Sequence, residues 1–234
     1  MRYLVIAAMM FSLPVEFLQA RSAKINDRLE SAAVVMYEIM KTPETSIPKD
    51  LLDKSVCVGI VPGQKKLAFV VGGSYGRGVL VCRKGGNGPW GAPSMFTVGG
   101  VNFGFQLGGE ATDFVLLVMN GRGAEKLLHD NTKIGADASA AGGPVGRSAE
   151  GATDLQLHAE ILTYSRSRGA FAGVSLDGQM FKQDGDSNEK LYGRKLAPED
   201  ILFKGVVPTP AAAQPLNTAL THFSPHGGEP FHPK

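Results

Sequence analysis

The sequence predicts an α+β domain: a curved, glycine-rich, mainly antiparallel sheet or partial barrel, with an N-terminal amphipathic helix and short flanking helices. Three observations lead to this prediction. A helical pattern comes first, several apolar β-branched segments then follow one another with only short turns between them, and the chain finally returns to helical segments. Strands that are adjacent in sequence and joined by short turns pair antiparallel, whereas a parallel sheet needs long crossover connections.

Length and composition fit one globular domain. Of the 234 residues, 43% are hydrophobic and 20% charged, which excludes disorder over most of the chain. The chain contains thirty glycines, and most of them lie between Gly59 and Gly151, often in pairs inside apolar runs. Paired glycines in such runs indicate bulges, tight bends or close backbone contacts in a curved sheet.

Residues 1–20 resemble a secretory signal peptide. Met1-Arg2 supplies a positive charge, Tyr3 to Leu13 is an apolar run, and a cleavage site follows Ala20. The run is too short to span a membrane. We therefore expect an exported protein, periplasmic or secreted, that is peripheral to a membrane.

Residues 23–41 form the predicted amphipathic helix. Ile25, Leu29 and Met36 repeat at helical spacing, and charged side chains fill the other face. Because Lys24, Arg28 and Lys41 flank the apolar stripe, the helix could lie on an acidic membrane surface. The alternative is that it covers the sheet, which is the commoner role of such a helix.

The remaining elements follow in order. A short helix begins after Pro48; strands are predicted in 56–61, 66–73, 75–83, 94–107 and 112–120; a helix starts near Gly123; and further strands lie within 155–184. Asp177-Gly178 predicts a hairpin turn between two of them. Short helices return in 187–205. The segment 206–234 is rich in Pro, Ala and Gly, which predicts a disordered tail after a domain of residues 21–205.

Cys57 and Cys82 are the only cysteines, each in a strand-like run. In an oxidising compartment they could pair. The pattern slightly favours the other interpretation, two buried thiols that act as small hydrophobic residues.

Ser74 lies in Gly72-Gly73-Ser74-Tyr75-Gly76, which has the G-x-S-x-G spacing of the serine hydrolase nucleophile elbow. That elbow needs a strand followed by a helix, but the residues after Gly76 read as a strand. Hydrolysis at Ser74 is therefore a minor alternative, and we predict that the protein is not an enzyme. Gly86 to Gly91 has the formal G-x-G-x-x-G spacing of a dinucleotide-binding loop, but Pro89 and Pro93 do not permit the regular helix that such a loop must open. No G-x-x-x-x-G-K-[ST] phosphate loop and no H-E-x-x-H zinc motif is present, so no cofactor and no metal are expected.

Charge is distributed unevenly along the chain. Residues 21–90 carry eleven Lys and Arg against six Asp and Glu, and no carboxylate occurs between Asp53 and Glu110. This asymmetry predicts an anionic partner for the N-terminal half. The candidate anion-binding residues are Lys65, Lys66, Arg77, Arg83 and Lys84, with Arg166 and Arg168. Nucleic acid is not expected, because no basic strand with interleaved aromatic residues is present.

Four ordered strings resemble the SYLF-domain (Ysc84-like) family: "VGIVPGQKKLAFVVGGSYGRGVLVCR", "FTVGGVNFGFQLGGEATDFVLLVMN", "KIGADASAAGGPVGR" and "AEILTYSRSRGAFAGVSLDG". The match covers residues 23–205. Members are described as lipid-binding, and in yeast and animals as phosphoinositide- and actin-associated. The resemblance implies a non-enzymatic binding domain whose N-terminal amphipathic segment, here Lys24 to Lys41, contacts lipid.

With a signal peptide the chain resembles a bacterial, exported member of this family. We therefore expect an anionic phospholipid membrane as its partner, rather than actin or inositol lipids. A protein that scaffolds the cell envelope through protein partners is the alternative hypothesis.

Overall fold

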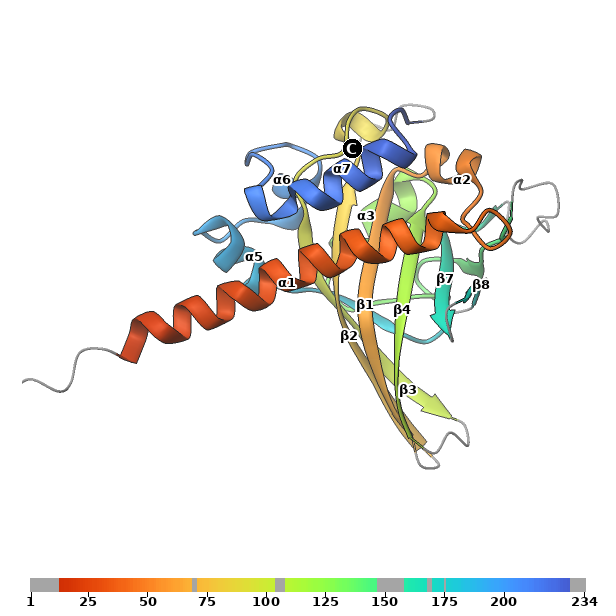
Figure 1. The fold of residues 1–234 in the computed structure, drawn as a ribbon, viewed down its shortest axis with the longest axis horizontal. Coiled ribbons are helices and arrows are strands. Elements are labelled where there is room, and N and C mark those ends of the chain that lie inside the picture. The colour runs from red at the N-terminus through yellow and green to blue at the C-terminus, as the bar shows by residue number, and fades with distance from the viewer. Residues whose placement is uncertain are drawn as a thin grey trace, which may run out of the picture.

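The computed structural model describes residues 13–68, 71–103, 108–146, 158–167, 170–174 and 176–227. It confirms an α+β fold with a curled sheet that forms a half-barrel (Figure 1). The strands are β1 (Cys57–Ala68), β2 (Val71–Cys82), β3 (Ser94–Phe103), β4 (Gly108–Val118), β5 (Thr132–Lys133), β6 (Ala140–Gly142), β7 (Ile161–Ser167), β8 (Ala170–Gly173) and β9 (Met180–Gln183). The helices are α1 (Leu13–Lys41), α2 (Lys49–Lys54), α3 (Gly121–Leu128), α5 (Gly185–Tyr192), α6 (Pro198–Leu202) and α7 (Gln214–Phe223), with short 3-10 turns η1 (Lys84–Gly86) and η3 (Ala211–Ala213).

The sheet runs in the order β5-β9-β3-β2-β1-β4-β7-β6, and β8 pairs with β7. All of these pairings are antiparallel except the one between β6 and β7. Asp177 and Gly178 do form a turn, with Gly178 at φ 80°. The predicted hairpin at this turn is nevertheless wrong, because β9 pairs with β3 and β5 and not with the strand before it.

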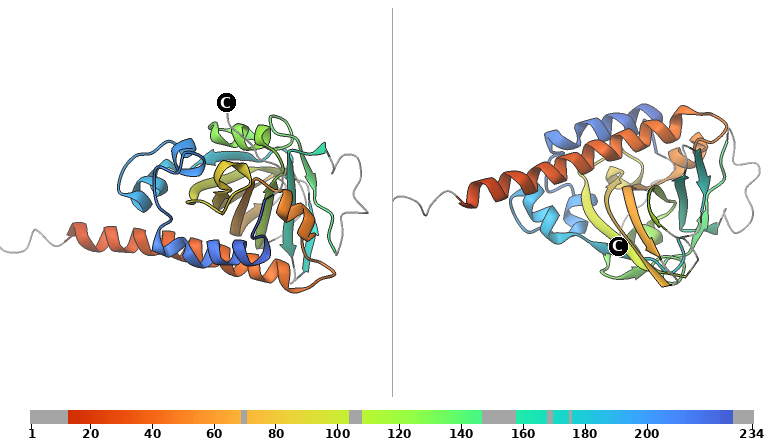
Figure 2. Two further views of the ribbon diagram at one scale, coloured as in Figure 1. Left: turned by 90° about the horizontal axis from the view of Figure 1, so that it is seen from above. Right: turned by 60° about the horizontal axis from the view of Figure 1, so that its bottom comes forward.

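Two apolar cores lie on opposite faces of the sheet. Helices α1, α2 and α7 cover one face, while α3 and α6 contribute to the core on the other (Figures 1 and 2). The apolar stripe of α1 belongs to the first core: Leu29, Met36 and Ile39 are fully buried there. The expectation that these apolar side chains contact lipid is therefore wrong, because they are buried against the sheet and α7.

Helix α1 continues without a break through Ala20 and Arg21, where the cleavage site is predicted. Its N-terminal end projects past the rest of the domain (Figure 1). Among the described residues, no helix combines the length and apolarity needed to cross a bilayer. Cleavage after Ala20 stays a prediction.

A β-bulge at Pro62-Gly63 changes which residues of β1 face each side. Ile60 pairs with Val79 and Lys65 with Tyr75, so β1 has one residue more than β2 over this interval. The register with β4 shifts in the same place. Gly63 takes φ +58°, a value that glycine adopts without a steric cost. The extra residue reverses the alternation, so Gln64 is buried and Lys65 is exposed.

The C-terminal segment is folded as far as it is described, which corrects the prediction of a disordered tail. Helix α7 lies along α1, and the rings of Tyr37 and Phe223 approach to 5.4 Å (Figure 2). Leu216 and Leu220 are fully buried in the core beneath α1. Prolines precede the helix and occupy its first turn, where their missing N–H costs nothing.

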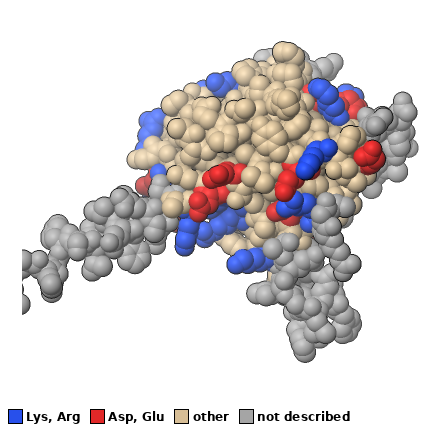
Figure 3. All heavy atoms as spheres, viewed as in Figure 1, with Lys and Arg blue, Asp and Glu red and all other residues tan. Residues whose placement is uncertain are grey.

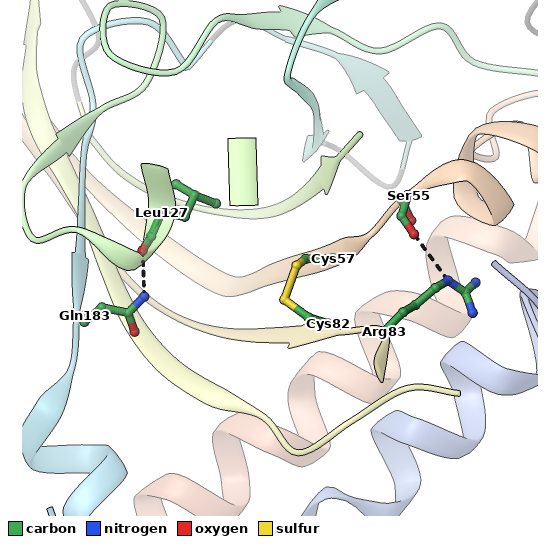
Figure 4. Close-up of a disulfide and its surroundings, with 6 residues drawn as sticks. All are labelled: Ser55, Cys57, Cys82, Arg83, Leu127 and Gln183. Atoms are coloured by element: carbon green, nitrogen blue, oxygen red, sulfur yellow. Dashed lines mark hydrogen bonds between the residues drawn. A yellow bond between two sulfur atoms is a disulfide. The ribbon is translucent and has the colours of Figure 1, made fainter. Parts of the chain in front are cut away.

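Cys57 and Cys82 form a disulfide between β1 and β2 (Figure 4). The two residues are direct cross-strand partners and both are fully buried. The interpretation as two separate buried thiols is therefore wrong; the sheet register brings together residues that are 25 positions apart.

Candidate functional site

A basic cleft of about 350 Å³ opens between α1, β2 and α5. Four basic side chains and two carboxylates line it, together with Ile25 and Ser187: the charged residues are Lys24, Arg28, Arg77, Lys190, Asp184 and Asp186. In Figure 3 basic side chains gather next to acidic ones in the lower part of the face shown. The excess of positive charge suits an anion.

Arg28 forms the fixed wall of this cleft. It is 8% exposed, and its Nη1 lies 3.3 Å from Asp184 Oδ2. Burial lowers the pKa of Arg28 against the opposing effect of Asp184. Asp184 also caps α5 by accepting hydrogen bonds from the Ser187 amide and hydroxyl. Although burial acts to raise it, the pKa of Asp184 is lowered by these hydrogen bonds and by Arg28.

Arg77 extends the cleft onto an open face of the sheet. It is exposed, and its Nε donates a 3.2 Å hydrogen bond to the hydroxyl of Tyr75, which raises the pKa of Arg77. Tyr75 itself is 52% exposed. Lys65 is the direct cross-strand partner of Tyr75. Arg77 pairs with Thr97 on β3, and Thr97 pairs with Lys182 on β9, so Arg77 and Lys182 lie in one row across the sheet. We call Lys65, Tyr75, Arg77 and Lys182 the basic face.

Arg83 does not belong to this surface, although the sequence places it among the anion-binding candidates. It is fully buried at the end of β2 and donates hydrogen bonds to the carbonyls of Ser55, Gly88 and Ser224 and to the Ser224 hydroxyl. Its guanidinium lies 3.9 Å from the ring centroid of Trp90. Burial lowers its pKa to about 10, partly offset by Asp53. Figure 4 shows the hydrogen bond to Ser55. Because two of its other hydrogen bonds reach Ser224, Arg83 connects the C-terminal segment to the rest of the domain.

Other candidates are scattered. Lys84 is exposed in η1, after the end of β2, and Lys41 is exposed at the C-terminal end of α1, away from the cleft at Lys24 and Arg28. Arg166 forms ion pairs with Glu38 and Asp113, so its charge is compensated within the protein. The Lys66 side chain and Arg168 lie outside what the structure describes.

The chain matches, over residues 99–223, the family described as "Ysc84: Las17-binding protein actin regulator". The chain belongs to this family. The finding confirms the resemblance stated above, and the matched region ends at the last residue of α7. The Ysc84 domain thus continues beyond residue 205, in keeping with the burial of α7.

Named relatives include the human SH3 domain-containing YSC84-like protein 1, which is 35% identical over 183 residues, or 78% of this chain and 53% of the relative. The Xenopus laevis protein of the same name is 32% identical over 184 residues, 78% of this chain and 54% of the relative. LAS seventeen-binding protein 3 of Saccharomyces cerevisiae is 35% identical over 169 residues, 70% of this chain and 36% of the relative. The chain therefore spans about half, or less, of these relatives.

The sequence did not reveal two basic residues of this Ysc84 domain: Lys190, which lines the basic cleft, and Lys182, which belongs to the basic face. Both lie in the C-terminal half, where acidic residues outnumber basic ones. Pairing of β9 with β3 and packing of α5 beside α1 bring them to the basic residues of the N-terminal half. Net charge along a sequence could not reveal this.

Ser74 lies in the interior of β2, with strand on both sides. It is 6% exposed, and its hydroxyl donates to the Gly100 carbonyl at 3.4 Å. The sharp strand-to-helix turn that presents a hydrolase nucleophile is not formed here. In this Ysc84 domain Ser74 links two strands.

Proposed function

We propose that the protein binds anionic phospholipid head groups at a membrane surface, without catalysis, through the basic cleft and the adjoining basic face. The observation that supports it most is the convergence of Lys24, Arg77 and Lys190, from three elements, around the buried Arg28. Each basic residue near an anionic membrane surface contributes roughly 1 kcal/mol of attraction, so several acting together give substantial binding.

Co-sedimentation with vesicles tests this proposal. Wild-type protein should sediment with phosphatidylglycerol-containing vesicles and not with pure phosphatidylcholine vesicles, and added salt should release it. The double variant Arg77→Glu/Lys190→Glu should bind at least about tenfold more weakly, because each reversal replaces attraction by repulsion. Lys54→Glu/Lys133→Glu, an equal total charge change at exposed sites on α2 and β5, is the matched control. Equal binding to both vesicle types would refute the proposal.

We further propose that the protein is exported. The Cys57–Cys82 disulfide supports this, because such bonds persist in oxidising compartments. The apolar run that ends near Leu13 and the cleavage sequence before Arg21 are also consistent with export. The mass of the protein purified from its native host gives the test: cleavage should leave Arg21 as the first residue, and an intact N-terminus would contradict it.

Protein binding is the second candidate function, because relatives are named for binding Las17. A groove of about 640 Å³ between α1 and the β1 bulge could serve such a partner; carboxylates of Asp27 and Glu30 lie beside Val34, which is 49% exposed. Cross-linking followed by mass spectrometry would test it. A partner captured by wild type and lost in Val34→Asp, together with no vesicle binding, would favour this candidate over lipid.

A further inference from the structure

Two of the six charged groups that line the basic cleft are already paired with each other. Arg28 and Asp184 form an ion pair, and their side chains are only 7% and 14% exposed. Asp184 is also held by the amide and hydroxyl of Ser187. This pair is part of the folded framework. The charges that remain available to a ligand belong to the other four charged residues of the cleft: Lys24, Arg77, Lys190 and Asp186.

These four side chains are exposed, and the protein does not compensate their charges. Within the described part of the chain, Lys24, Asp186 and Lys190 make no ion pair and no side-chain hydrogen bond, and Arg77 donates only to the uncharged hydroxyl of Tyr75. Asp186 and Lys190 are four residues apart on α5 and so share a side of that helix, yet they too remain unpaired. The cleft therefore offers a ligand three cations and one carboxylate.

The two guanidinium groups mark the part of the cleft that suits a phosphate. Burial lowers the pKa of Arg28 and the charge of Arg77 lowers it further, against the opposing effect of Asp184. Arg28 and Arg77 are thus close enough to repel each other. An anion bound between them would relieve this repulsion, and phosphate oxygens accept strong hydrogen bonds from guanidinium groups.

Asp186 places a second requirement on the ligand. A ligand that carries only negative charge is repelled by this carboxylate, whereas an ammonium group on the ligand would donate a charge-assisted hydrogen bond to it. Asp186 also has a structural role, because an acidic residue in the first turn of α5 interacts favourably with the helix dipole. The two roles are separable, since only the first depends on the charge of the ligand.

Phosphoserine is the lipid head group that matches this set of charges. Its phosphodiester and carboxylate groups supply two negative charges for the three cations, and its ammonium group supplies a positive charge for Asp186. Phosphatidylglycerol has no ammonium group, and phosphatidylethanolamine has no net negative charge. The cleft volume of about 350 Å³ lies at the small end of the range for ligand sites, which suits a head group better than a whole lipid.

We propose that the basic cleft selects phosphatidylserine among anionic phospholipids, with Asp186 as the residue that recognises its ammonium group. This inference rests on the proposed function and specifies the head group. The adjoining basic face attracts any anionic membrane and does not distinguish between head groups. A phosphoserine residue within a peptide has no free ammonium group, so the charges of the cleft favour the lipid as the source of the ligand.

Vesicle co-sedimentation with three lipids tests the selectivity. Phosphatidylserine and phosphatidylglycerol, each mixed at the same mole fraction into phosphatidylcholine, give vesicles of equal charge. Wild-type protein should bind the phosphatidylserine vesicles about tenfold more tightly, which is the effect of one additional charge-assisted hydrogen bond. N-acetylated phosphatidylserine has one negative charge more but no ammonium group, and it should bind more weakly than phosphatidylserine. Charge alone predicts the opposite order.

Asp186→Asn should abolish the preference for phosphatidylserine. Its binding to phosphatidylglycerol should stay equal or become up to about fivefold tighter, because a repelling carboxylate is removed. Glu189→Gln, the same charge change on α5 outside the cleft, is the matched control and should keep the preference. Asp186→Glu should keep it as well. A purely structural role of Asp186 would weaken binding to both vesicle types equally, and that result would overturn the assignment.

The outcomes distinguish this inference from the function on which it rests. Wild-type protein that binds neither acidic vesicle refutes the proposed function, whereas equal binding to phosphatidylserine and phosphatidylglycerol refutes the selectivity alone. If Asp186→Asn does not fold, Asp186→Ser replaces it with the same expected result. Glycerophosphoserine, the soluble head group, should bind more weakly than the vesicles in calorimetric titration, because it does not reach the basic face. Equally tight binding of glycerophosphoserine, or tighter binding of a phosphoserine peptide, would overturn the inference.

Discussion

Replacing Arg83 by alanine should destabilise the fold and leave the membrane surface unchanged. Arg83 makes four hydrogen bonds to carbonyl and hydroxyl acceptors and stacks on Trp90, all without solvent contact. A hydrogen bond from a charged donor contributes about 1.5–3 kcal/mol, and its loss leaves a buried acceptor unpaired. Allowing for the burial cost of the guanidinium that is removed, we expect a loss of about 3–5 kcal/mol, a large part of the stability of a typical domain.

Urea unfolding followed by circular dichroism measures this loss. Lys84→Ala is the control, because it removes a neighbouring charge that is exposed, and it should change the free energy of unfolding by no more than about 0.5 kcal/mol. Hydrogen exchange should show α7 losing protection first in Arg83→Ala, since two of the hydrogen bonds reach Ser224 just after that helix. An Arg83→Ala protein with wild-type stability but weakened vesicle binding would refute this reasoning and restore Arg83 to the lipid surface.

Three further predictions follow from the same contacts. The double change Cys57→Ser/Cys82→Ser should cost about 3–4 kcal/mol of stability in urea unfolding, because the disulfide closes a loop of 25 residues; an unchanged midpoint would contradict this. A chain ending at Val206 should be insoluble or unfolded by circular dichroism, whereas one ending at Gly227 should fold; a folded shorter chain would show that α7 is dispensable. The pKa of Asp184 in the folded protein lies below the ordinary value of 3.8, so its contribution to stability is complete above about pH 4 and is lost as the pH falls through the lowered pKa. Asp184→Asn should therefore reduce the decline in the urea-unfolding free energy below about pH 4. An acid profile identical to that of the wild type would argue against the ion pair with Arg28.

Local sequence patterns were sufficient to predict a helix or strand where residues within that element alone determine its structure. The apolar periodicity of residues 23–41 predicted α1, and glycine-bounded apolar runs predicted that strands fill the central region. The predicted strand 66–73 has the wrong bounds, because β1 ends at Ala68 and β2 begins at Val71. Local patterns failed where the structure of a segment depends on a partner far away in the sequence. The segment around Leu216 and Leu220 reads as a disordered tail until α1 and the sheet supply a core for it. The turn at Asp177-Gly178 formed, but β9 found its partners elsewhere in the sheet.

The candidate site shows the same division. Sequence determined that the region between Asp53 and Glu110 is basic and free of carboxylates, because charge is a property of each residue alone. Only the tertiary structure decided which charges reach the surface: Arg83 is consumed by internal hydrogen bonds, Arg166 by ion pairs, and Lys190 joins Arg77 across α5 and β2. The physical reason is that burial and pairing depend on sheet register and helix packing, which bring together residues far apart in the chain.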